Sequence, residues 1–143
     1  MSETSSLASG GAPGTSVPGD PAEVELRLPA DGAYASVLRT LTAGLAARLD
    51  LTMDDIEDLR IAVSEAAAMV LEEADPGATL DCRFRLGEGE LALTISTTAQ
   101  DPASPDYESF GWQVLATLAT EAAIDAAPGS YAVRLTVRSS LEP

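Results

Sequence analysis

The chain has 143 residues, of which 45% are hydrophobic, and this is enough to bury one core in a single domain. It carries twenty-three acidic residues against eight basic ones, all of them arginine, for a formal net charge of −15. Such a charge argues against binding to a nucleic-acid backbone, because two polyanions repel each other, and it favours basic protein partners.

Cysteine content and hydropathy bear on location. The single cysteine, Cys82, has no second thiol to pair with, and no apolar run reaches the length of a membrane span. The N-terminus lacks the charged-then-apolar pattern of a signal peptide. We therefore expect a cytoplasmic protein without a membrane partner. We interpret Cys82 as a small buried hydrophobe, since the chain has no histidine or other cysteine to share a metal.

The N-terminal part of the chain changes character near residue 21. Residues 1–21 are rich in Ser, Gly, Ala and Pro and offer little to bury, which predicts a disordered tail ahead of one folded domain over 22–140. Apolar residues then alternate with charged ones from Val24 to Leu28, which predicts a half-buried strand that ends at Pro29.

Two helices are predicted next. Asp31 is a suitable N-cap for the first, and its expected buried stripe comprises Tyr34, Leu38, Leu41, Leu45 and Leu49. Thr52 caps the second, with Asp55 three residues later as an acidic variant of the capping box. The apolar stripe of this second helix comprises Leu59, Val63, Ala67 and Val70, and its opposite side carries Asp54, Asp58, Glu65 and Glu72.

The second half of the chain reads as strands around one more helix. Alternation predicts strands over 80–86 and 91–96, joined by a hairpin at 87–90. Residues 99–108 form a loop, and a helix follows from Ser109, with Phe110 expected to anchor it to the sheet. Strands over 122–126 and 131–137 close the chain. This order predicts a two-layer α/β sandwich: a mostly antiparallel mixed sheet with three helices on one face.

The stretch from Val24 to Leu71 resembles the serine-kinase anti-sigma factors, a branch of the histidine-kinase-like (Bergerat, GHKL) ATPases. The runs Thr52-Met53-Asp54-Asp55 and Val63-Ser64-Glu65-Ala66 carry the resemblance. It implies the histidine-kinase-like ATPase fold. In that family a catalytic glutamate is followed four residues later by a Mg²⁺-binding asparagine. Here Glu65 remains but Met69 holds the asparagine position, and a thioether is a poor ligand for a hard cation.

The other nucleotide motifs of the family are also degenerate. Asp101 stands for the adenine-binding aspartate of the Asp-x-Gly-x-Gly loop, but the glycines are missing and Pro102 follows. Only Gly111 remains of the second glycine motif. Residues 86–133 contain no basic residue and seven acidic ones, an unfavourable setting for phosphates. The resemblance thus implies a degenerate ATP site formed by Glu65, Met69, Asp101 and Gly111. We expect no resident metal or cofactor, with ATP and Mg²⁺ as the ligands if the site still works.

The resemblance and the charge together predict an anti-sigma factor that binds an RNA polymerase sigma factor. Arg39 aligns with a family arginine that contacts both the sigma factor and its antagonist. The family further implies release by a STAS-type anti-anti-sigma factor, and a homodimer. The alternative is an active ATP-dependent serine kinase that phosphorylates its STAS antagonist, with Glu65 as general base. A third reading is a binding module for an unrelated partner.

Overall fold

The computed structural model describes residues 21–140, so the predicted tail lies outside the described residues except for Pro21. The elements follow one another as β1 (Ala22–Pro29), a short 3-10 turn η1 (Gly32–Tyr34), α1 (Ala35–Ala46), α2 (Met53–Glu73), β2 (Thr79–Gly87), β3 (Glu90–Ala99), α3 (Phe110–Leu118), β4 (Glu121–Ala127) and β5 (Gly129–Arg138).

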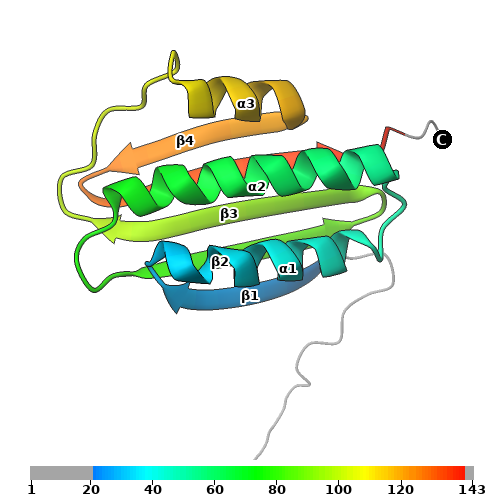
Figure 1. Cartoon of the computed structure of the whole chain (residues 1–143), viewed down its shortest axis with the longest axis horizontal. Helices are drawn as coiled ribbons and strands as arrows, with labels where there is room; N and C mark the ends of the chain where they lie inside the picture. The colour runs from blue at the N-terminus through cyan, green and yellow to red at the C-terminus, as the bar shows by residue number, and fades with distance from the viewer. Residues whose placement is uncertain (1–20, 141–143) are drawn as a thin grey trace, which may run out of the picture.

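The described strands form one sheet in the order β1-β2-β3-β5-β4, and each neighbouring pair is antiparallel. The three α-helices lie side by side on one face of this sheet, with α2 between α1 and α3 (Figure 1). The predicted two-layer sandwich is therefore confirmed. After α3 ends, the chain turns back as β4. This strand pairs with β5 at the edge of the sheet and lies beneath α3 (Figure 1).

The core lies between the two layers and follows the predicted alternation of the strands. In β5 the side chains of Tyr131, Val133, Leu135 and Val137 are all buried. Cys82 in β2 is buried too, and burial, together with the charge of Asp81, raises the pKa of its thiol to about 12. The thiol is thus a packed apolar group, as predicted. No helix within residues 21–140 is long and apolar enough to cross a membrane.

The start of α2 has the predicted capping box. The Asp55 N–H donates to Thr52 Oγ1 at 3.0 Å, and the Thr52 N–H donates to the Asp55 carboxylate at 3.0 Å. Asp55 also accepts hydrogen bonds from the backbone N–H and the hydroxyl of Ser140. Burial alone would raise the pKa of Asp55, but these hydrogen bonds outweigh burial and leave the pKa below its ordinary value.

The predicted stripe of the first helix is wrong in part. Asp31 does cap the chain, accepting from the Ala33 N–H at 2.9 Å, but it caps the 3-10 turn η1, and α1 begins only at Ala35. This tighter turn changes the register, so Tyr34 is 41% exposed. The fully buried side chains of α1 are Leu38, Thr42 and Ala46, while Leu41, Leu45 and Leu49 are half-buried against the core. Thr42 is accommodated because its hydroxyl donates to the Leu38 carbonyl.

Candidate functional site

Three of the four predicted nucleotide-site residues meet where α3 packs on α2. A Cβ atom placed on Gly111 would lie 3.3 Å from Glu65 Oε1 and 3.3 Å from Met69 Sδ. The two helices therefore touch through the glycine backbone, and a larger residue at this position would push against both side chains. Glu65 and Met69 lie one turn apart on α2, which places them on the same side of that helix.

The N-terminal turn of α3 is held by local contacts. Ser109 is the N-cap, and its Oγ accepts from the Trp112 N–H at 3.2 Å. The Tyr107 and Trp112 rings meet edge to face with centroids 4.9 Å apart, and the Gln113 side chain donates to the Tyr107 carbonyl. These contacts fix the loop before α3 and keep Gly111 against α2.

Asp101 is not joined to the other three residues. It is exposed in the loop between β3 and α3, and it has no hydrogen bond or ion pair within the described range 21–140. That loop is instead tied to the end of α2, because the Ala103 N–H donates to Glu73 Oε1 at 2.9 Å. The sequence alignment of Asp101 with an adenine-binding aspartate thus finds no support in a shared contact.

The donor set at the α2–α3 contact does not match what a magnesium nucleotide requires. Mg²⁺ takes oxygen ligands, but the atom beside Glu65 is the thioether sulfur of Met69. In residues 21–140, no three His, Cys, Asp or Glu side chains group closely enough to hold a metal ion. The Gly111 backbone also lies against these side chains, where the family resemblance would require phosphate groups.

Two large apolar side chains near this contact are exposed. Phe110 was expected to anchor α3 to the sheet, and this is wrong: it is 78% exposed. As the first residue of α3 it precedes the buried Leu115 by five positions, which turns its side chain away from the core. Ile61 on α2, which lies on the same side as Glu65, is 42% exposed. A helical-wheel projection predicts that Ile61 is exposed, but it does not predict the exposure of Phe110 in the first turn of α3.

Arg39 lies half-buried on α1. Neither it nor Arg48, in the turn after α1, has an ion-pair partner among the described residues. The other six arginines all form ion pairs, and they are Arg27, Arg60, Arg83, Arg85, Arg134 and Arg138. Free cationic groups within residues 21–140 are therefore confined to the α1 side of the molecule.

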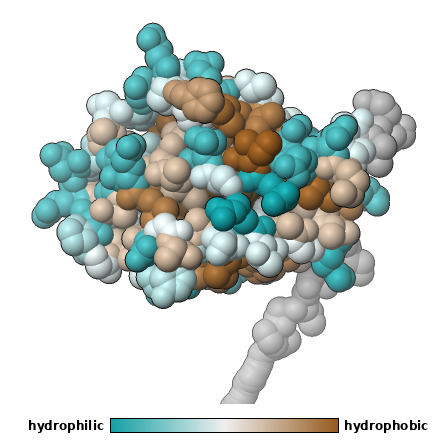
Figure 2. Space-filling model, viewed as in Figure 1, coloured by the Kyte–Doolittle hydropathy of each residue, from teal (hydrophilic) through white to brown (hydrophobic). Residues whose placement is uncertain are grey.

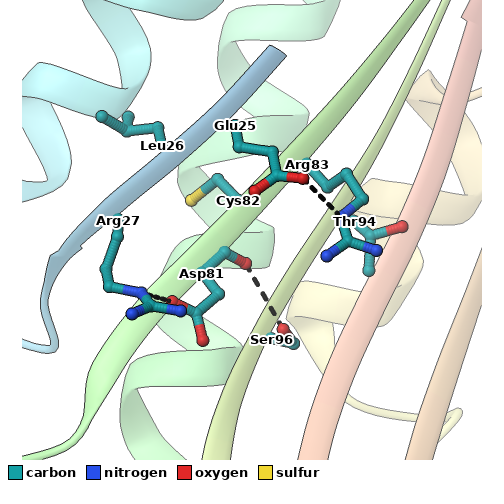
Figure 3. Close-up of a pocket in the computed structure, with 8 residues that line it drawn as sticks. All are labelled: Glu25, Leu26, Arg27, Asp81, Cys82, Arg83, Thr94 and Ser96. Atoms are coloured by element: carbon teal, nitrogen blue, oxygen red, sulfur yellow. Dashed lines mark hydrogen bonds and ion pairs between the residues drawn. The ribbon is translucent and has the colours of Figure 1, made fainter. Parts of the chain in front are cut away.

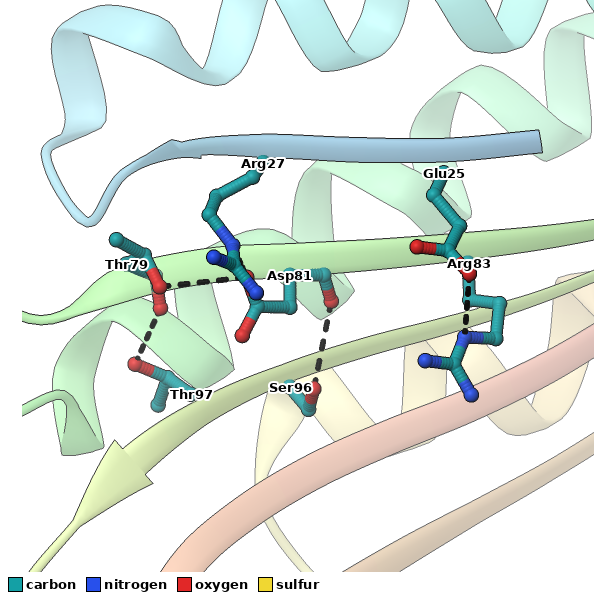
Figure 4. Close-up of polar contacts among 7 residues, drawn as sticks. All are labelled: Glu25, Arg27, Thr79, Asp81, Arg83, Ser96 and Thr97. Carbon is teal, nitrogen blue, oxygen red and sulfur yellow. Dashed lines mark hydrogen bonds and ion pairs between the residues drawn. The ribbon is translucent and has the colours of Figure 1, made fainter. Parts of the chain in front are cut away.

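A hollow of about 590 Å³ lies on the open face of the sheet, far from the α2–α3 contact (Figure 3). Its charged side chains neutralise one another across β1 and β2: Arg27 with Asp81 at 2.7 Å, and Arg83 with Glu25 at 3.7 Å (Figure 4). Thr94 and Ser96 of β3 line its other side. Because these charges are already paired, we assign no chemistry to the hollow.

The sheet and its three covering helices define an α/β sandwich of the histidine-kinase-like fold. A crystal structure of the RsbU and RsbW domains of a Mycobacterium tuberculosis protein matches 82% of this chain and 32% of that chain. The TM-score is 0.66 at 19% sequence identity, which supports the fold.

The sequence is similar to proteins named serine-protein kinase RsbW. It is 37% identical to the one from Halalkalibacterium halodurans over 91 residues, 63% of this chain and 54% of the relative. It is 34% identical to the one from Bacillus subtilis over 76 residues, 51% of this chain and 48% of the relative. The chain thus spans about half the length of the curated relatives it matches. No protein-family model matches it. The predicted resemblance to serine-kinase anti-sigma factors is confirmed.

Proposed function

We propose that this protein is an anti-sigma factor that binds an RNA polymerase sigma factor and holds it away from the core enzyme, without using ATP. Two kinds of observation support the proposal. The similarity to serine-protein kinases RsbW supports the class of protein. The α2–α3 contact supports the loss of nucleotide chemistry.

The observation that carries the proposal is the contact of Gly111 with Glu65 and Met69. A nucleotide between α2 and α3 requires space for phosphates and oxygen atoms for Mg²⁺, and the contact offers packed side chains and a sulfur atom. A fold that keeps its helical layer but fills this space still presents a surface to proteins. Binding without phosphoryl transfer is the function that this geometry supports best.

The charge distribution supports a basic partner. The α2 helix carries seven acidic residues and one arginine, and that arginine, Arg60, is paired with Glu57. Sigma factors present basic surfaces to DNA, so a strongly negative inhibitor is steered towards them and competes for those surfaces. In this proposal a STAS-type anti-anti-sigma factor releases the sigma factor, Arg39 contacts these partners, and the protein forms a homodimer.

The alternative is an active serine kinase that phosphorylates a STAS-type antagonist. One observation favours it: Glu65 is half-buried and has no hydrogen bond or ion pair within the described residues, so its carboxylate is available as a general base. Against it stands the same packing of Gly111 and Met69. A base without a bound and oriented ATP cannot transfer a phosphoryl group.

Transcription in vitro tests the proposal. The purified protein is added to core polymerase and each purified sigma factor of the source organism, on a promoter that the sigma factor recognises. We expect inhibition with at least one sigma factor, unchanged by omission of ATP and by Glu65→Gln. Inhibition with none would overturn the proposal. A STAS-domain protein that becomes phosphorylated with the wild type and not with Glu65→Gln would establish the kinase instead.

A further inference from the structure

One edge of the sheet and the outer side of α1 lie at the same margin of the molecule. Within the described residues β1 pairs only with β2, so β1 is an edge strand. The α1 helix runs along this margin in the direction opposite to β1 (Figure 1). An edge strand presents a row of backbone N–H and C=O groups that a further strand can pair with. This margin is therefore open to the addition of a strand.

The outer side of α1 carries a stripe of residues spaced three or four apart, and these are Tyr34, Val37, Leu41, Gly44 and Arg48. Tyr34 and Val37 are 41% and 44% exposed, and a Cβ on Gly44 would meet nothing within 4 Å. A glycine inside a helix lowers its stability, and here no packing within the chain requires one. Because α1 is right-handed and lies in front of the sheet in Figure 1, this stripe turns away from α2. Figure 2 shows mostly pale to brown residues over α1.

From this margin we propose that two copies of the chain form a dimer about a two-fold axis. In this dimer β1 pairs antiparallel with β1 of the second copy, which joins the two sheets, and the two α1 helices pack antiparallel above the seam. The inference rests on the homodimer of the proposed function and names its surface. A two-fold axis sets each residue of the margin against a residue of the same margin, so this surface must be self-complementary.

The charges of β1 are self-complementary in one register. Residues directly opposite each other in an antiparallel pair point to the same face, so the axis passes beside one residue and pairs its neighbours. An axis beside Leu26 sets Glu25 opposite Arg27 of the second copy, twice over. An axis beside Glu25 or Arg27 would set like charges together, and one beside Val24 would set Glu23 opposite Glu25. The charges therefore select the Leu26 register.

This register keeps the ion pairs that the chain already has. Within the chain Glu25 pairs with Arg83 and Arg27 pairs with Asp81, in both cases with β2. The seam adds the neighbouring opposite charge of the second copy to each of these pairs. Leu26 itself is half-buried and packs against the core, so pairing with Leu26 of the second copy also covers apolar surface.

The stripe on α1 is self-complementary about Leu41. An axis beside Leu41 sets Val37 against Gly44 of the second copy, so that a side chain enters the space above a glycine, as a knob enters a hole. The same axis brings Tyr34 to the turn that carries Arg48, where a guanidinium can lie on an aromatic ring. Arg48 has no ion-pair partner within residues 21–140. Leu26 and Leu41 lie near the middle of β1 and α1, so one axis can serve both elements.

The charge of α1 and the position of Arg39 agree with this surface. Two copies that each carry a net charge of −15 repel each other, so a contact is favoured where acids are few. The α1 helix contains one basic residue and no acidic one. That basic residue, Arg39, lies two positions before Leu41 and therefore on the opposite side of the helix. The dimer thus leaves Arg39 available to the sigma factor and the STAS-type partner.

Sedimentation velocity of the full-length protein over about 1 to 200 µM tests the dimer, because an interface of one strand and one helix is small. Gly44→Gln fills the space opposite Val37, and we expect the dimer to weaken about tenfold or more. The thermal midpoint should stay the same or rise, since glutamine favours a helix more than glycine does and meets nothing within the chain. The matched control Ala68→Gln, exposed on α2, should change the dimer constant less than about twofold.

A second pair of variants tests the seam. Arg27→Glu and Arg85→Glu make the same change in net charge, and each breaks one exposed ion pair between β1 and β2. Only Arg27→Glu sets like charges together across the seam. We expect it to weaken the dimer about tenfold or more, and Arg85→Glu to weaken it less than about threefold.

Three results would overturn the dimer surface. The first is a wild type that stays monomeric over the whole concentration range, and the second is a dimer that both Gly44→Gln and Arg27→Glu leave intact. The third is a monomer whose sigma-factor binding is lost in Gly44→Gln, because the stripe would then belong to the sigma factor. The inhibition of transcription is measured separately, so the first two results leave the anti-sigma function standing.

Discussion

The helical layer and the open face of the sheet use charged residues in opposite ways. On the sheet, the antiparallel register sets Glu25 opposite Arg83 and Arg27 opposite Asp81, so charges are neutralised where they occur. On α2, the acids at 54, 58, 65 and 72 have no basic partner within the described residues. On α2, seven acidic residues and one arginine leave an excess of six negative charges, and the exposed side chain of Ile61 lies on the same helix.

Composition alone therefore does not locate a binding surface. Arginine-rich strands on the open sheet face make a polar and internally satisfied surface, and such a surface gives little energy to a partner because its ion pairs must first be broken. The helical layer offers unpaired charge and apolar area together.

The largest expected effect comes from the packing of the helical layer on the sheet. Leu59 on α2 is fully buried, and Leu59→Ala should lower the free energy of unfolding by about 2 to 5 kcal/mol, through lost burial and a cavity. Ile61→Ala on the exposed side of the same helix should cost less than about 1 kcal/mol. Urea unfolding measures both. Equal losses at the two positions would show that α2 does not pack as described.

The next effect concerns the α2–α3 contact. Gly111→Leu should destabilise the protein by about 1 to 3 kcal/mol, because the new side chain meets Glu65 and Met69 at close range and overpacks the contact. Adding Met69→Ala should recover part of the loss by making room. Thermal and urea unfolding of the single and double variants measure this coupling. A double variant that is no more stable than Gly111→Leu alone would contradict a direct contact of position 111 with Met69.

Acid titration tests the start of α2. The folded-state pKa of Asp55 lies below its ordinary value of 3.8, which we take for the unfolded chain. Its contribution is therefore fully present above that unfolded value and is lost as the pH falls through the folded pKa. Asp55→Asn should cost about 1 to 2 kcal/mol at neutral pH. The difference between wild type and variant should shrink below about pH 4, in urea unfolding at several pH values. A constant difference would contradict the proposed role of the carboxylate.

The smallest effect is expected on the open face of the sheet. Arg83→Gln removes an exposed ion pair with Glu25 and should change the free energy of unfolding by no more than about 0.5 kcal/mol. It should also leave sigma-factor binding unchanged, since this face lies opposite the helices. A tenfold loss of sigma-factor binding in Arg83→Gln would show that the partner contacts the open face of the sheet.

Local patterns in the sequence predicted most of the fold. The Thr52 and Asp55 capping box, the alternation in β2, β3 and β5 and the Ser109 cap all follow from short-range rules, and the structure has them where they were expected. Tyr34 was misplaced because a 3-10 turn, which alternation and helical spacing do not signal, shifts the register of α1. The burial of Phe110 was predicted wrongly, because the side chain of a residue in the first turn of a helix need not lie on the helix's apolar stripe.

The candidate site could be predicted only from the resemblance to the serine-kinase anti-sigma factors. Glu65, Met69 and Gly111 align with motifs of the family. They come together because the two helices that carry them pack against each other. Asp101 aligned with a loop whose glycines are absent here, and no contact joins it to the others. Pairing of charges, which separates the two faces, depends on strand register and on three-dimensional neighbours. It could not be counted from the sequence.

Titration calorimetry with Mg-ATP measures whether the region between α2 and α3 binds a nucleotide. The serine-protein kinase RsbW of Bacillus subtilis, assayed under the same conditions, is the positive control. We expect no saturable heat with this protein up to about 1 mM nucleotide. We expect none with Met69→Asn either, because only Gly111 remains of the family's glycine motifs. Saturable binding with a micromolar Kd, abolished by Glu65→Gln, would show that the space between α2 and α3 still accepts a nucleotide and would contradict the account.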